Sequence, residues 1–100
     1  MTINDHNLSL RLMGESDYSV IREGRAVGRM RLADERPDHE MWEWAINPPL
    51  PVPSWGVGRA ASLEDAKMAF EAAWERFYAR LSPADLEHWH KHQDGVRERH

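Results

Sequence analysis

The chain has 100 residues, no cysteine and a net charge of −4, with 13 lysine and arginine residues against 17 aspartate and glutamate residues. The absence of cysteine excludes disulfides, thiolate metal sites and a cysteine nucleophile. The length suits a single domain, 1–100, and the negative charge lowers the expectation of nucleic-acid binding. No apolar run is long enough to cross a membrane and no signal peptide is evident, so we expect a cytoplasmic protein with mobile ends at 1–6 and 96–100.

Residues 8–46 predict an antiparallel meander of three to four strands, at 8–12, 18–22, 26–32 and 41–46. Apolar and polar residues alternate in these runs, which predicts one face in the core and one face in water. The alternation groups Leu8 with Leu10 and Leu12, Tyr18 with Val20, Ala26 with Gly28, Met30 and Leu32, and Trp42 with Trp44 and Ile46, and it leaves Val27, Arg29 and Arg31 on the other side of the third strand.

The segment 47–58 contains four prolines. We expect it to cross from the sheet to a helix in an extended, polyproline-like form, because proline lacks the donor that a helix or strand interior needs. Pro48 and Pro51 match the spacing of proline-rich ligands, although a stiff linker is the simpler interpretation. Trp55 either fills the edge between sheet and helix or contacts a partner from the surface.

Residues 62–81 predict a long helix. Ser62 suits the N-cap position, with acidic residues in the first turn and arginines near the last. Ser82–Pro83 begins a second helix that we expect to run to about Gln93 and to stop near Gly95. The order β-β-β-β-α-α is that of an α+β two-layer sandwich, with the long helix on the apolar face of the sheet. The face of this helix that we expect in the core holds Leu63, Ala66, Phe70, Ala73, Trp74, Phe77 and Leu81.

One set of short stretches and single residues is distinctive: Tyr18–Val20, Val27–Arg29, Trp42–Trp44 and Gly58–Leu63, together with Ala66, Phe70 and Trp74. This set resembles a group of short bacterial proteins of about this length, mostly from alphaproteobacteria, that form a family of unknown function. The resemblance spans roughly Leu8 to Leu81 and implies a shared small fold. It implies no activity, cofactor or site residue.

The first candidate site would bind another protein. It consists of Trp55, Pro51 and Pro53 in the proline segment and Trp89 in the second helix. Large aromatic side chains are enriched at protein–protein interfaces. We therefore expect the proline segment and the second helix to supply the contact surface, with an unknown protein or a second copy of the chain as the partner.

The alternative site would bind nucleic acid through the exposed face of the sheet. Arg11, Arg29 and Arg31 are expected on that face, and arginine suits phosphate groups. A water-facing surface with cross-strand ion pairs explains the same residues without a ligand.

A third candidate is a metal site in the second helix. Asp85, His88 and His92 fall near one face of that helix, and two imidazoles with a carboxylate can hold Zn²⁺ or Ni²⁺. No fourth ligand is evident. A solvated helix whose histidines are partly charged explains the pattern without a metal.

No catalytic motif is evident, so we expect a small non-enzymatic protein without a cofactor. The leading hypothesis is binding to another protein or self-association, and the alternative is nucleic-acid binding. A further hypothesis is a small-ligand pocket between sheet and helix, lined by Trp42, Trp44 and Trp74. That pocket requires a sizeable cavity in place of a filled core.

Overall fold

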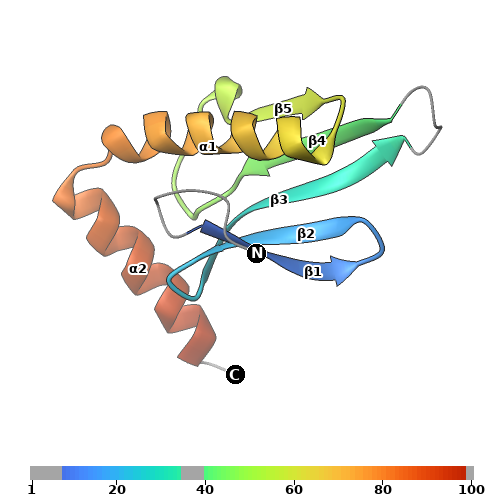
Figure 1. Ribbon diagram of the computed structural model, residues 1–100. Coiled ribbons are helices and arrows are strands. Elements are labelled where there is room, and N and C mark those ends of the chain that lie inside the picture. Colours follow the sequence, from blue (N-terminus) through green and yellow to red (C-terminus); the bar gives the residue numbers. More distant parts are fainter. Residues whose placement is uncertain (1–7, 35–39, 99–100) are drawn as a thin grey trace.

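The fold is α+β, with a five-stranded antiparallel sheet that carries a long helix on one face and a second helix at one end (Figure 1). The computed structural model describes residues 8–34 and 40–98. The sheet is a meander of order β1-β2-β3-β4-β5, so the predicted fold class is confirmed with one more strand than expected. The elements are β1 (Leu8–Gly14), β2 (Asp17–Arg22), β3 (Arg25–Asp34), β4 (Met41–Ile46), the 3-10 helix η1 (Ser54–Gly56), β5 (Val57–Ala60), α1 (Leu63–Ala79) and α2 (Pro83–Glu98).

The unexpected strand, β5, follows the proline segment directly. It pairs with β4, where Gly58 lies opposite Trp44 and Arg59 lies opposite Glu43. The predicted extended crossing ended at Gly58 and so missed this strand. A glycine is required there because a Cβ at position 58 would lie 2.6 Å from the indole of Trp44.

The core lies between the sheet and α1. Helix α1 begins as predicted, with the Ser62 hydroxyl accepting a hydrogen bond from the Asp65 amide at 3.1 Å. It contacts β4, β5 and η1, and the Phe70 ring occupies the space above Gly28 that a side chain would fill. The hypothetical ligand pocket is filled in the structure, because Trp42, Trp44 and Trp74 are all buried in this core.

A bulge in β3 changes which side chains are buried. Val20 pairs with Gly28 and Ile21 pairs with Ala26, so Val27 is an extra residue between them. Val27 and Gly28 are both buried while Ala26 is exposed, and the predicted sides of Ala26 and Val27 are therefore wrong. The alternation of the sequence does not reveal this bulge.

Leu12 was grouped with two leucines that are buried, yet its side chain is 63% exposed. It lies near the end of β1, an edge strand that α1 does not cover. The neighbouring Met13 falls at an irregularity in the pairing of β1 with β2 and is exposed to the same extent. This end of β1 therefore presents apolar surface to solvent.

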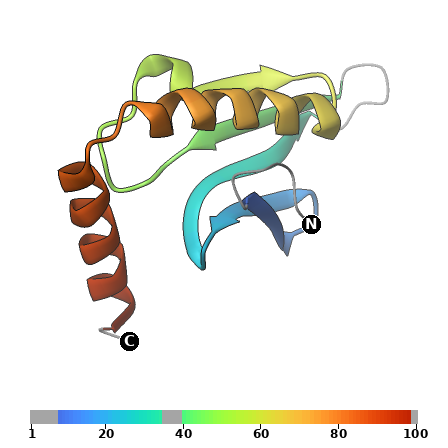
Figure 2. The ribbon, with the colours of Figure 1, turned by 60° about the vertical axis from the view of Figure 1, so that its left-hand side comes forward.

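Helix α2 lies at one end of the sheet and contacts it at the turn between β2 and β3. It starts with reciprocal hydrogen bonds in which the Ser82 amide donates to the Asp85 carboxylate (2.9 Å) and the Asp85 amide donates to the Ser82 hydroxyl (3.1 Å). Figure 2 shows it turning sharply away from α1 and running past the turn between β2 and β3. The predicted stop near Gly95 is wrong, since the helix continues to Glu98 and a glycine costs a helix only about 1 kcal/mol.

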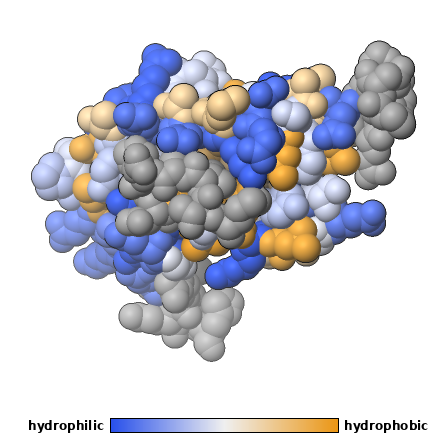
Figure 3. Space-filling view, viewed as in Figure 1, coloured by the Kyte–Doolittle hydropathy of each residue, from blue (hydrophilic) through white to orange (hydrophobic). Residues whose placement is uncertain are grey.

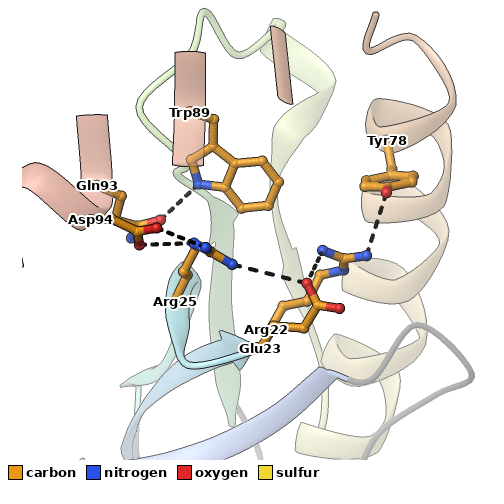
Figure 4. Close-up of polar contacts among 7 residues, drawn as sticks. All are labelled: Arg22, Glu23, Arg25, Tyr78, Trp89, Gln93 and Asp94. Atoms are coloured by element: carbon orange, nitrogen blue, oxygen red, sulfur yellow. Dashed lines mark hydrogen bonds and ion pairs between the residues drawn. The ribbon is translucent and has the colours of Figure 1, made fainter. Parts of the chain in front are cut away.

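A group of polar and aromatic contacts holds α2 to the β2–β3 turn (Figure 4). Arg25 donates two hydrogen bonds to Asp94, at 3.1 and 2.9 Å, and Gln93 joins the Trp89 indole (2.7 Å) to the Ala26 carbonyl (2.9 Å). Trp89 is fully buried, edge-on to Trp74. We call this group the hairpin clamp; it comprises Arg22, Glu23, Arg25, Tyr78, Trp89, Gln93 and Asp94.

Of the predicted mobile ends, 1–6 and the last two residues lie outside the described residues, while 96–98 belong to α2. Within the described part of the chain, no helix is both long and apolar enough to span a membrane.

Candidate functional site: the open face of the sheet

No helix in the described part of the chain covers the face of the sheet opposite α1, and all five strands contribute to this face. The strand register aligns its side chains in two adjacent rows across the sheet. We call the residues of these rows the open face: Arg11, Ser19, Arg29, Ala45 and Val57 in one row, and Asp17, Arg31, Glu43 and Arg59 in the other.

The open face is positively charged although the chain is negative. Four guanidinium groups and two carboxylates leave a surplus of two positive charges, compared with −4 for the whole chain. Such segregation gives one surface a field that attracts anions, which the net charge of the protein conceals.

Two of the four arginines are paired within the face. Arg29 donates hydrogen bonds of 2.9 and 2.6 Å to the Asp17 carboxylate, and these bonds hold the pKa of Asp17 below its usual value. Arg31 lies 3.6 Å from Glu43. Arg11 and Arg59 are exposed and make no hydrogen bond or ion pair with any residue that the structure describes. The two positive charges in surplus therefore belong to side chains with free donors.

The open face is hollowed in two places. The larger hollow, about 390 Å³, lies over β3, β4 and β5 and is lined by Arg31, Glu43 and Ala45 and by the β5 residues Val57 and Arg59. The smaller one, about 240 Å³, includes Met13, Asp17 and Asn47 in its lining, and the two hollows meet at Arg29.

The larger hollow combines the features of a binding surface. Val57 is among the most exposed large apolar residues of the described chain. It stands two residues before the unpaired Arg59 on the same edge strand, so both side chains project to the same side.

None of the nine residues that define the open face is aromatic, although Trp44 contributes to the lining of the larger hollow. Tyr18, Trp42 and Trp44 belong to the same strands but project to the other side, where Trp42 and Trp44 are buried. Proteins that bind single-stranded nucleic acid through a sheet stack the bases on exposed aromatic rings. The open face can contact phosphate but offers no such platform.

Sequence reasoning placed Arg11, Arg29 and Arg31 on one exposed face, and the strand register brings all three there. It missed Arg59 and Val57, because it missed β5. The alternation of Val57, Gly58, Arg59 and Ala60 after the proline segment is the signal that would have found them.

The four residues proposed to contact a partner protein differ in how far their side chains are buried. Pro51 is exposed, while Pro53 and Trp55 are partly buried, and the Trp55 ring lies against the end of α1. Trp89 is fully buried in the hairpin clamp. Its side chain cannot contact a partner in this conformation, although Trp89 was predicted to be one of the partner-binding residues. Its helical neighbours had suggested a polar, solvent-exposed helix, and only contacts with distant residues bury it.

The three candidate metal ligands do not converge. The rings of His88 and His92 are exposed, with centroids 6.3 Å apart. The Asp85 carboxylate accepts the hydrogen bond from the Ser82 amide, and this bond lowers the pKa of Asp85. Across residues 8–34 and 40–98, no group of three or more His, Cys, Asp or Glu side chains is placed to hold a metal ion. The structure assigns Asp85 to the cap of α2.

Comparisons of the chain with family models, with curated proteins and with solved structures find no match. The resemblance to short bacterial proteins stays a prediction.

Proposed function

We propose that the protein is a non-enzymatic binding module whose open face takes an extended, acidic segment of another protein. The observation that carries the proposal is the larger hollow, where the unpaired Arg59 stands beside the exposed Val57 at the edge of the sheet. An anionic partner satisfies the free guanidinium, and an apolar side chain of that partner covers the valine.

The spacing on β5 specifies the partner further. Val57 and Arg59 are two residues apart on one strand, which is about 7 Å. An extended segment with an aliphatic residue and an acidic residue two positions apart presents both to this side of the sheet. Arg11 at the other edge can meet a second carboxylate of the partner.

Charge supports a protein partner over nucleic acid. Arg29 and Arg31 already face carboxylates, so only two guanidinium groups are free to replace counterions on a phosphate backbone. The chain as a whole repels nucleic acid at −4. Nucleic-acid binding remains the alternative outcome of the experiment below.

A second copy of the chain is one protein that meets the description. Helix α1 exposes Glu64, Asp65 and Glu75, which can supply carboxylates to the open face of a neighbour. In the view of Figure 3, hydrophobic surface forms small separate groups among hydrophilic residues. On the face that Figure 3 shows, this pattern favours a charge-dependent contact over a large apolar dimer interface.

The experiment is a selection from a library of displayed peptides against the immobilised protein, followed by measurement of affinity for the selected sequences. We expect a consensus with Asp or Glu two residues from an aliphatic residue. Arg59→Glu should weaken binding at least about five-fold at low salt, because an exposed attraction becomes a repulsion. Lys91→Glu is the matched control, since Lys91 is an exposed cation on α2 outside the open face.

A consensus without acidic residues, or equal binding by the Arg59→Glu and Lys91→Glu proteins, would contradict the proposal. Two parallel measurements separate the remaining partners. A dimer in light scattering that Arg59→Glu dissociates identifies the second copy, against a monomer mass of 11.7 kDa. Retardation of random DNA at low salt, lost in Arg59→Glu, would favour nucleic acid instead.

A further inference from the structure

Two arginines at the end of α1 are gathered over one indole ring. Arg76 and Arg80 are one helical turn apart, and their guanidinium carbons lie 4.2 and 5.6 Å from the centre of the Trp55 ring. Trp55 belongs to η1, whose turn is closed by a hydrogen bond from the Gly56 amide to the Pro53 carbonyl (2.9 Å). Stiff proline backbone on one side and β5 on the other hold this ring in place.

Within residues 8–34 and 40–98, neither arginine has an anionic partner. Among the described residues, no carboxylate lies within ion-pair distance of Arg76 or Arg80, and neither guanidinium donates a hydrogen bond. Arg22, Arg25 and Arg29, by contrast, all have such a carboxylate. The favourable field at the C-terminal end of a helix explains why cations are tolerated here. It does not explain why both are arranged over a single ring with their donors unused.

A hollow of about 200 Å³ includes Arg80 in its lining. Its other lining residues are Leu50, Pro51, Phe77, Leu81 and Asp85. The Asp85 carboxylate is engaged by the Ser82 amide and belongs to the α2 cap. The hollow thus combines four apolar residues with the Arg80 guanidinium and with a carboxylate that is already hydrogen-bonded. Its size suits a single ring or a branched chain, because a protein cavity of about 150 Å³ accommodates benzene.

We propose that this end of the molecule binds a small ligand that carries an oxyanion next to an apolar group. The oxyanion, a carboxylate or a phosphate, pairs with Arg76 and Arg80, and the apolar group enters the hollow beside Leu50 and Phe77. Stacking on Trp55 restricts the two guanidinium groups before the ligand arrives, so less conformational freedom is lost on binding. This site lies on the α1 side of the sheet, and it is independent of the function proposed for the open face.

The experiment is a titration of ¹⁵N-labelled protein with four probes: phenyl phosphate, phenylacetate, inorganic phosphate and the neutral benzyl alcohol. We expect saturable shifts of the Trp55 indole N–H and of the amides of Leu50 and Leu81 with the first two probes. The two aromatic anions distinguish phosphate from carboxylate as the preferred oxyanion. Inorganic phosphate and benzyl alcohol should each bind at least about ten-fold more weakly than the aromatic anions. Inorganic phosphate lacks the apolar group, and benzyl alcohol lacks the oxyanion.

The test compares two proteins. One is the double variant Arg76→Gln/Arg80→Gln, and the other is the control variant Arg59→Gln on the open face. The double variant should lose at least about ten-fold in affinity for the aromatic anions, and the control should bind them unchanged. Should the double variant fail to fold, Arg80→Gln alone makes the same test. The proposal is overturned if the anions cause no saturable shift, if benzyl alcohol binds as well as they do, or if the arginine variants bind them normally.

Discussion

The hairpin clamp and the open face use the same residue type in opposite ways. The side chains of Arg22 and Arg25 in the clamp are only 13% and 18% exposed, and each faces a carboxylate. Arg11 and Arg59 on the open face are exposed and have no partner in the described part of the chain. Arginine therefore joins α2 to the sheet at one place and provides unsatisfied charge at the other. The difference separates residues that maintain the fold from residues that are free to bind.

The aromatic residue at the centre of the clamp gives the strongest test of this comparison. Trp89→Ala removes a fully buried indole that contacts Trp74, and we expect a loss of about 3–5 kcal/mol in the free energy of unfolding. Urea denaturation followed by circular dichroism measures it. A loss below about 1 kcal/mol would mean that α2 is not docked in solution.

Removing one arginine from each region compares them directly. Arg25→Ala leaves the partly buried Asp94 without its two hydrogen bonds, so we expect a loss of about 1–2 kcal/mol in the free energy of unfolding. Arg59→Ala should change it by less than about 0.5 kcal/mol. Equal losses in the two urea curves would remove the distinction between the regions.

The pH dependence of the clamp is the smallest expected effect. Burial lowers the pKa of His90 below its usual 6.5, and the positive charges of Arg25 and Arg22 act in the same direction while Asp94 and Glu23 oppose them. The unfolded chain thus binds a proton more readily at this residue than the folded chain does. The contribution of His90 to the free energy of unfolding should be fully present above about pH 6.5. It should decrease as the pH falls from there towards the lowered pKa of His90.

His90→Gln supplies the control for this titration. It removes the ionisable ring, and the slope of unfolding free energy between about pH 6.5 and pH 5 should become shallower than in the unmodified protein. Asp17 contributes only at lower pH, because its pKa lies below the ordinary 3.8. Identical slopes of unfolding free energy against pH in the two proteins would show that folding does not change the pKa of His90.

Local sequence signals were sufficient for the elements that local physics determines. The cap at Ser62, the aromatic stripe of α1 and the alternation in β2 and β4 gave the fold class and the core face correctly, and so did the alternation in β1 up to Leu10. The arginines of the open face followed from the same alternation. These features depend on residues within a few positions of one another, so a single sequence contains them.

Other features depend on residues distant in the sequence. The bulge at Val27 and the burial of Trp89 arise from contacts between segments that no local pattern connects. Strand β5 is only four residues long and includes a glycine, which weakens its strand signal. Because β5 was not predicted, Arg59 was not placed on the sheet. Only the pairing of β4 with β5 in the structure places its free guanidinium group on the open face.

The meander order also determines how the chain closes upon itself. Every strand pairs with its neighbour in sequence, so the sheet is built from short loops, whereas the contact between Arg25 and Asp94 spans 69 positions. Closing a loop of that length costs entropy that is recovered only when the β2–β3 turn is already in place. We therefore expect α2 to dock after the sheet has formed and to be the element that detaches with the least disruption of the remaining fold.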